Sequence, residues 1–215
     1  IVNQAISLGY EYIGIGDHNP SITSYTPARI ITEIQKRSEA IEHLKYSRTI
    51  NILKTLEVDI RTSGELAVND AGLELLDLAI ISVHSSMRMD KTDMTKRVLA
   101  GLAHPKAKIL GHPTGRLLGS REGYELDWDQ VFDFCLKNNK FIEINAQPSR
   151  LDLPDTLVRD AVNAGVKLII DTDAHAADQL GLMRFGVDVA RRGWATPADI
   201  INTLSWAKFS ATINL

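Results

Sequence analysis

The sequence predicts an α/β protein in which a barrel of parallel strands is surrounded by helices. Short apolar runs alternate with helical patterns along all 215 residues, and each run ends in a polar cluster. No glycine-rich phosphate loop follows the first run, which favours a closed barrel over an open doubly wound sheet. No linker or low-complexity segment interrupts the series, so a single domain spanning residues 1–215 is expected.

The predicted strands are short runs of apolar and β-branched residues bounded by polar clusters. In chain order they cover residues 12–16, 50–58, 78–83, 107–110, 141–144 and 167–170. Most of these runs begin roughly 30 residues apart, about the length of one strand-helix unit.

Helices are expected between the strands, and capping residues mark their ends. Periodicity places two of them at residues 1–8 and 128–136. Three helix starts combine a cap residue with a proline, and these are Thr26-Pro27, Asp152 with Pro154 and Asp155, and Thr196-Pro197. Three helices are expected to end at glycines, namely Gly9, Gly101 and Gly165.

Composition limits the class of protein and its partners. The chain is 44% hydrophobic and 24% charged, and it has no run of about 18 apolar residues, which argues against a membrane partner. No leader of basic and apolar residues is evident. The single cysteine, Cys135, excludes a disulfide within the chain. The protein is therefore predicted to be cytoplasmic. Cys135 is expected in the core. The net charge is −3, whereas a domain that binds nucleic acid by neutralising phosphates alone is normally basic.

Ionisable and polar side chains gather where the predicted strands end. Because the carboxyl ends of parallel strands meet on one face of a barrel, these side chains are expected to share one rim. They are Asp17, His18, Glu57, Asp59, His84, His112, Glu143, Asn145, Asp171, Asp173 and His175. Imidazole and carboxylate together suit Zn²⁺, Mn²⁺ or iron better than Ca²⁺. The pattern therefore predicts a metal centre on this rim.

Each candidate ligand also has an ordinary structural alternative. A lone histidine at a strand end is more often a hydrogen-bonded structural residue, and Glu57 could be a solvated carboxylate. Four histidines at strand ends favour ligation, and Asp173 and His175 are two residues apart, which points both to one face of an extended chain. The residues expected only to orient a ligand or cap a turn are Asp17, Asp59, Glu143, Asn145 and Asp171. His43 and His104 lie in helical stretches and are expected at the surface.

Longer motifs carry a resemblance to a known family. They are Gly16-Asp17-His18-Asn19-Pro20-Ser21, Leu56-Glu57-Val58-Asp59-Ile60, Ser82-Val83-His84-Ser85-Ser86, Gly111-His112-Pro113-Thr114-Gly115-Arg116-Leu117-Leu118, Glu143-Ile144-Asn145-Ala146-Gln147-Pro148-Ser149-Arg150-Leu151-Asp152-Leu153, Asp173-Ala174-His175 and Met183-Arg184-Phe185-Gly186-Val187. With these motifs the sequence resembles PHP (polymerase and histidinol phosphatase) domains over essentially its whole length. It is most similar to the C-terminal PHP domain of bacterial and archaeal family X DNA polymerases.

The resemblance implies a distorted seven-stranded βα barrel, similar to a TIM barrel, that binds up to three Zn²⁺ or Mn²⁺ ions through nine ligands. Six of these ligands match positions here, and they are His18, Glu57, His84, His112, Asp173 and His175. The other three belong to an upstream strand, so the chain is expected to be an N-terminally incomplete PHP domain that lacks the first strand. Fewer ions are then expected, and the site of Glu57, His84 and His112 should fill first.

The function implied by the resemblance is metal-dependent phosphoester hydrolysis. The implied activity is the 3′-5′ exonuclease or 3′-end processing of a family X polymerase, with DNA 3′ ends as substrate and an upstream polymerase domain as partner. Glu57 would bridge two ions, and His112 or His175 would orient water or the leaving group. The arginines expected to meet phosphate are Arg88, Arg116, Arg121 and Arg150. Two alternatives remain open: a stand-alone phosphatase of the histidinol-phosphatase type acting on a small phosphate ester, and a non-catalytic structural domain.

Overall fold

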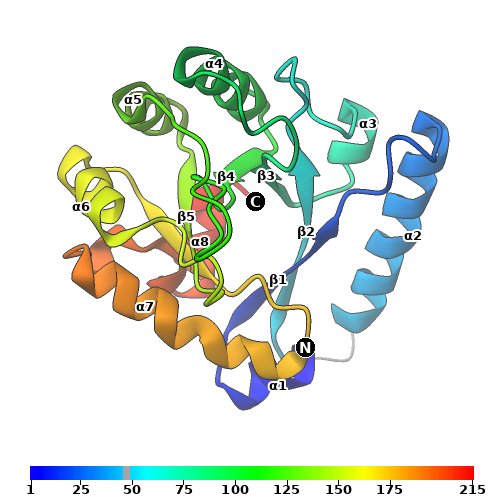
Figure 1. Ribbon diagram of the computed structural model, residues 1–215. Coiled ribbons are helices and arrows are strands. Elements are labelled where there is room, and N and C mark those ends of the chain that lie inside the picture. The colour runs from blue at the N-terminus through cyan, green and yellow to red at the C-terminus, as the bar shows by residue number, and fades with distance from the viewer. Residues whose placement is uncertain (46–48) are drawn as a thin grey trace.

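A computed structural model describes residues 1–45 and 49–215. Within these residues the protein is an α/β fold with one curled sheet of six strands, all parallel and ordered as in the chain (Figure 1). The strands are β1 (Tyr12–His18), β2 (Asn51–Asp59), β3 (Leu78–Ser82), β4 (Ala107–Leu110), β5 (Phe141–Asn145) and β6 (Leu168–Asp171). All six predicted strands are therefore confirmed, with ends that shift by no more than two residues.

Most of the helices lie around the outer side of the curled sheet, as Figure 1 shows. The α-helices are α1 (Val2–Ser7), α2 (Pro27–Lys45), α3 (Asp70–Leu73), α4 (Lys91–Leu102), α5 (Trp128–Asn138), α6 (Asp155–Ala164), α7 (Met183–Arg192) and α8 (Trp206–Ile213). Three short 3₁₀ turns accompany them, η1 (Ala177–Leu182), η2 (Pro197–Asp199) and η3 (Ile201–Thr203). None of the helices in the described ranges combines the length and the apolar character that crossing a membrane requires.

Over the described residues, the strand order is that of a curled sheet whose two ends do not pair with each other. β1 and β6 are the two edge strands of the sheet over the described residues. The seventh strand implied by the resemblance is not among the strands of this part of the chain. The all-parallel α/β architecture is thus confirmed, while barrel closure stays a prediction.

One predicted helix end is wrong, and two predicted helix starts are confirmed only in part. Gly101 lies inside α4, where an added Cβ would sit 3.1 Å from Ile60, so it is there for close packing and not to end the helix. The Thr196-Pro197 pair opens only a 3₁₀ turn, although its capping box with Asp199 is present. Asp152 does not cap α6, because Pro154 holds that position and the Asp152 side chain is buried.

Other boundaries follow the sequence. Pro27 begins α2, with the Thr26 hydroxyl accepting a hydrogen bond from the Arg29 amide at 3.3 Å. Gly165 ends α6 in a left-handed conformation with a φ of 86°. Cys135 is buried in the core, as expected.

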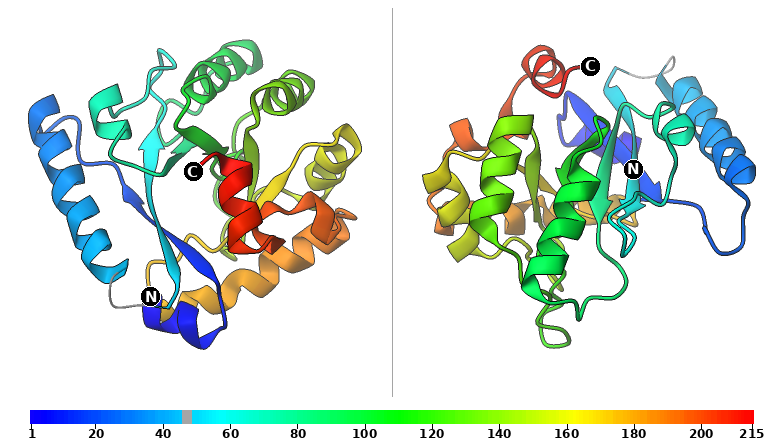
Figure 2. Two further views of the ribbon diagram at one scale, coloured as in Figure 1. Left: turned by 180° about the vertical axis from the view of Figure 1, so that it is seen from behind. Right: turned by 90° about the horizontal axis from the view of Figure 1, so that it is seen from above.

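The apolar core has two main parts, one on each side of the sheet. The larger part fills the space between the outer face of the strands and the helices, and includes Ile81, Val98 and Leu110. The smaller part lines the inner face at the amino ends of the strands, where Phe141 packs near Phe209 of α8. Figure 2 shows α8 at this end of the sheet. The core therefore occupies the amino end of the inner face and leaves the carboxyl ends of the strands for polar side chains.

Candidate metal centre

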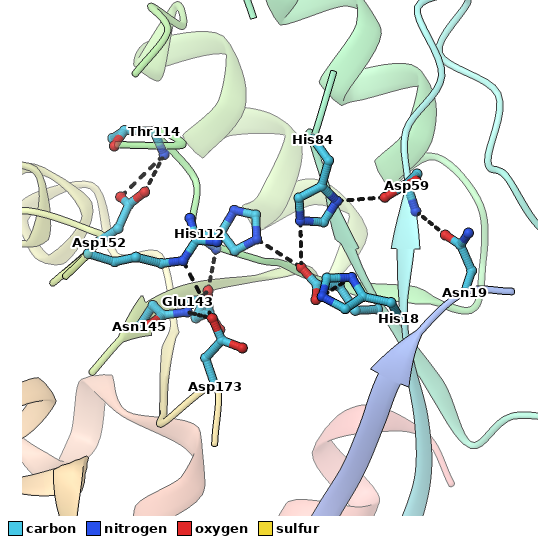
Figure 3. Close-up of polar contacts among 12 residues, drawn as sticks. His18, Asn19, Asp59, His84, His112, Thr114, Glu143, Asn145, Asp152 and Asp173 are labelled. Carbon is cyan, nitrogen blue, oxygen red and sulfur yellow. Dashed lines mark hydrogen bonds and ion pairs between the residues drawn. The ribbon is translucent and has the colours of Figure 1, made fainter. Parts of the chain in front are cut away.

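His18, His84 and His112 lie close together (Figure 3). Each of these three histidines contacts the Glu57 carboxylate. His18 Nδ1 is 3.2 Å from Glu57 Oε2, and His84 Nε2 is 3.2 Å from Oε1. His112 Nε2 is closest, at 2.8 Å from Oε1. The structure thus brings four of the six predicted ligands into one contact group.

Parallel strand register explains why residues so far apart in the chain meet here. His18, at the end of β1, pairs directly with Glu57 in β2. β3 ends at Ser82 and β4 at Leu110, so His84 and His112 follow two residues later on neighbouring strands. The ends of β1, β3 and β4 therefore place their histidines at the same edge of the sheet as Glu57 of β2, as the sequence predicted.

The donor atoms fit a divalent metal ion. Ligand atoms of His18, Glu57 and His84 all lie within 4.8 Å of one another. His84 Nε2 and His112 Nδ1 are buried without a hydrogen-bond partner in the described structure, although His84 Nε2 lies close to Glu57. Imidazole nitrogen combined with carboxylate oxygen is a donor set for divalent transition metals. These residues could therefore bind such an ion.

Asp59 orients the His84 ring. Its Oδ1 is 2.6 Å from His84 Nδ1, which directs Nε2 of the same ring toward Glu57. Asp59 is held in turn by Asn19, whose side-chain oxygen accepts a hydrogen bond from the Asp59 amide at 2.7 Å. A carboxylate on the far nitrogen of a ligating histidine is a common way of fixing the tautomer and the direction of the ring.

The electrostatics of the cluster favour an ionised Glu57 beside a protonated His84 when no metal is bound. Burial would raise the pKa of Glu57, but its contacts with His112 and His84 outweigh burial and hold the pKa well below its usual range. Burial would lower the pKa of His84, yet contacts with Asp59 and Glu57 raise it to about 9. A metal ion must therefore displace a proton from His84.

The metal-free protein is expected to lose stability as the pH rises from 6.5 to 9. The pKa of His84 is higher in the folded state than the ordinary value of 6.5, so its contribution is complete below 6.5 and disappears through about 9. The change in unfolding free energy should be on the order of 2 kcal/mol, measured by urea denaturation in EDTA. Asp59→Asn should flatten this dependence, whereas His43→Gln, on the exposed surface of α2, should preserve it. An equally steep profile in Asp59→Asn would contradict the assignment.

A second polar group lies beside the histidine cluster and contains the predicted ligand Asp173. Asn145 Nδ2 is 3.3 Å and Arg150 Nε 3.4 Å from Asp173 Oδ2. The Glu143 carboxylate accepts a hydrogen bond from the His112 amide. Burial and the adjacent Asp171 carboxylate raise the pKa of Glu143 well above its usual range. Glu143 and Asn145 thus contact neighbouring groups of the site, and their supporting role at a metal centre stays a prediction.

Two predicted site residues lie at the exposed margin. The His175 side chain is 68% exposed, and its Nδ1 is 2.9 Å from the Asp173 carbonyl oxygen. The structure does not bring it into contact with Glu57. Asp17 forms an ion pair with Arg37 of α2, which also donates to the Ile15 carbonyl at 2.6 Å. Asp17 therefore ties the end of β1 to α2 beside His18.

The predicted phosphate-binding arginines have different surroundings. Arg116 donates to the carbonyls of Arg150 and Leu151, and Arg121 donates to the Gly115 carbonyl at 2.7 Å, so both brace the rim loops. Arg88 is exposed on the loop that follows His84. Arg150 is only 16% exposed, contacts Asp173, and has a buried Nη1 with no hydrogen-bond partner in the described structure. Arg150 is the arginine best placed beside the candidate metal centre.

Asp152 is a supporting residue that the sequence reasoning missed. Its buried carboxylate accepts from the Thr114 amide with both oxygens, at 3.2 and 3.1 Å (Figure 3). These bonds hold the turn that follows His112, a residue with a φ of 26°. An acidic residue between Leu151 and Leu153 was the available signal, but it suggested a helix cap instead.

A cavity of about 740 Å³ opens along the inner face of the sheet. At one end it is lined by His18, Glu57 and His112, and at the other by apolar residues such as Leu53 and Phe209. The candidate metal ligands therefore face a space large enough to admit a small molecule.

Known proteins are similar to this chain over most of its length. No protein-family model matches the chain. The DNA polymerase/3′-5′ exonuclease PolX of Bacillus subtilis (strain 168) is 36% identical over 201 residues, which are 93% of this chain and 35% of that protein. The chain thus spans about a third of the length of this relative.

Two shorter relatives also match. Proteins named "probable phosphatase" from Thermoanaerobacter sp. (strain X514) and Thermoanaerobacter pseudethanolicus (strain ATCC 33223 / 39E) are each 26% identical over 210 residues, covering 93% of this chain and 81% of the relative. The polymerase and the phosphatases together imply a PHP-like domain, in agreement with the resemblance of the motifs.

Proposed function

We propose that this chain is a metal-dependent phosphoesterase that acts on the 3′ ends of DNA. The observation that carries the proposal is the Glu57 carboxylate surrounded by three imidazoles, with Arg150 and Asp173 beside it. This arrangement combines a place for divalent metal with a cation suited to phosphate. The relatives named for exonuclease and phosphatase activity support hydrolysis of a phosphoester.

Each residue has a role in this proposal. His18, Glu57, His84 and His112 would hold metal, and Asp173 would join them. Bound Zn²⁺ or Mn²⁺ would polarise the phosphoryl oxygens and lower the pKa of a coordinated water. Asp59 and Asp152 keep the imidazoles of His84 and His112 in position. His175, exposed beside Asp173, would exchange a proton with the leaving oxygen in this proposal.

Arg150 would neutralise phosphate charge. Its guanidinium contacts the Asp173 carboxylate through Nε and has a buried Nη1 without a partner in the described structure, so the N–H groups of Nη1 remain for a phosphate oxygen. Phosphate bound here would replace part of the interaction with Asp173. Charge-assisted hydrogen bonds of this kind are among the stronger ones.

The choice of DNA over a small ester rests on the polymerase relative. That protein is 36% identical, against 26% for the phosphatases. A polymerase domain is accordingly the proposed partner. The second candidate substrate is a small phosphate ester. It is favoured because the match covers 81% of the length of each probable phosphatase.

The test compares two substrates under defined metal conditions. The chain would be incubated with Mn²⁺, Zn²⁺ or EDTA and either a 5′-labelled oligonucleotide or p-nitrophenyl phosphate. Shortening of the oligonucleotide from its 3′ end with metal but not with EDTA is expected. Hydrolysis of p-nitrophenyl phosphate alone would establish the second candidate, and no hydrolysis of either substrate would reject both.

Arg150→Ala is expected to raise KM for the oligonucleotide about 10- to 100-fold while the affinity for Mn²⁺ changes little. The reason is the loss of a charge-assisted hydrogen bond to phosphate, with the histidine cluster intact. Steady-state kinetics and calorimetric metal titration measure the two effects. Arg29→Ala is the matched control, because Arg29 stacks over Tyr25. Equal losses of metal affinity and activity would show a structural role for Arg150.

A further inference from the structure

Trp194 is an unusually exposed aromatic side chain. It is 67% exposed, whereas the other two tryptophans of the chain are partly buried. Its φ of 63° lies in the left-handed region, which bulky residues rarely adopt. Its amide bonds to the Arg191 carbonyl at 3.0 Å, and the following Ala195 amide bonds to the Ala190 carbonyl at 3.0 Å. The chain therefore holds an apolar ring in solvent at a conformational cost.

Arginines surround the exposed ring. The Arg159 guanidinium lies 4.0 Å from the centroid of Trp194, and its Nε is buried without a hydrogen-bond partner in the described structure. Arg191 and Arg192 are exposed at the end of α7, and Arg192 pairs with Asp155 at 2.7 Å. Asp160 and Asp188 are also exposed on α6 and α7, so acidic side chains lie among these arginines.

Helix α7 connects the candidate metal centre with Trp194. Met183, its first residue, and Val187 line the cavity that contains Glu57 and His112. Arg192 is its last residue, and Gly193 and Trp194 follow. Figure 1 shows α7 along the front of the molecule, with its C-terminal end beside α6. Ten residues of helix measure about 15 Å, which about four nucleotides cover at a stacked spacing of about 3.4 Å.

We propose that Trp194, with Arg159, Arg191 and Arg192, is a stacking platform for a base of single-stranded DNA that runs from the metal centre along α7. An aromatic face beside guanidinium groups binds bases without sequence preference, and the arginines meet the phosphates. The platform rests on the proposed function for its DNA substrate. It would offer three arginines to the phosphates of a nucleic acid, although the net charge of the chain is −3.

Tryptophan fluorescence tests the platform without any catalysis. In EDTA, dT8 is expected to quench the emission of the wild-type chain. Trp194→Phe should abolish the quenching. Trp128→Phe should retain it, because Trp128 is a partly buried residue of α5 that packs near Phe132. Trp194→Ala should weaken binding of labelled dT8 about tenfold, as expected for the loss of one stacked base.

The possible results separate this inference from the proposed function. Retained quenching in Trp194→Phe, or equal dT8 affinity in Trp194→Ala, would overturn the platform even if metal-dependent exonuclease activity is present. Quenching that depends on Trp194, without hydrolysis in Mn²⁺ or Zn²⁺, would support the platform and reject the proposed function. Absence of dT8 binding, together with self-association that Trp194→Ala removes in sedimentation, would overturn the platform in favour of a protein interface.

Discussion

Glu57→Gln is expected to abolish metal binding at the His18, Glu57 and His84 cluster and to reduce phosphoester hydrolysis about 1,000-fold or more. Glutamine preserves the shape of the side chain but removes the negative charge, which three imidazoles share in the structure. The Glu57 side chain is 14% exposed and lies at the carboxyl end of its strand, away from the apolar packing. The fold should therefore survive the substitution.

Three measurements on this variant distinguish a metal ligand from a structural residue. Calorimetric titration with Mn²⁺ reports metal binding, the labelled oligonucleotide reports hydrolysis, and circular dichroism reports the fold. Glu125→Gln is the control, since Glu125 is exposed on the loop before α5 and should behave as wild type. A folded Glu57→Gln protein with normal metal-dependent activity would disprove the assignment of the site.

Phe141→Ala is expected to have the largest effect on stability, lowering the free energy of unfolding by about 3–5 kcal/mol. Phe141 is only 1% exposed and packs with Ile109, Ile169 and Phe209 at the amino end of the sheet. Alanine would leave a cavity between the strands and α8, because neighbouring backbone cannot collapse into it.

Urea denaturation measures this loss. Phe134→Ala is the control, because Phe134 is a partly exposed residue of α5 and should lose much less stability. The folded Phe141→Ala protein should still bind metal with the wild-type stoichiometry, because the histidine cluster lies at the opposite end of the strands. A denaturation midpoint unchanged from wild type would contradict the assignment of Phe141 to the core.

The local pattern of the chain was enough to locate the strands and the chemistry at their ends. Alternation of β-branched runs with capped helices predicts parallel strands, and parallel strands carry their carboxyl ends to one edge. His18, Glu57, His84 and His112 could therefore be assigned to one rim before their contacts were known. Gly165 and Pro27 marked helix ends because backbone geometry restricts each of them locally.

Other features depend on contacts between segments far apart in the chain. Asp152 binds the Thr114 amide 38 residues away, and that role outweighs its local tendency to cap a helix. From its neighbours in sequence, Gly101 is predicted to end a helix. In the structure it lies inside α4, where Ile60 packs too closely for a larger side chain. Arg116 and Arg150 are both arginines on loops of the rim, so the sequence does not distinguish them. In the structure Arg116 donates to a backbone carbonyl, whereas Arg150 contacts the Asp173 carboxylate.

The sequence by itself determined the α/β class, the positions of the six strands and the residue types that converge at their carboxyl ends. Periodicity and capping are properties of neighbouring residues, so they can be read along the chain. Only the tertiary structure decided which side chains meet: Asp59 with the far nitrogen of His84, Glu143 with the His112 amide, and Arg159 with Trp194. These pairs form because packing of the helices on the curled sheet sets distances that no local pattern encodes.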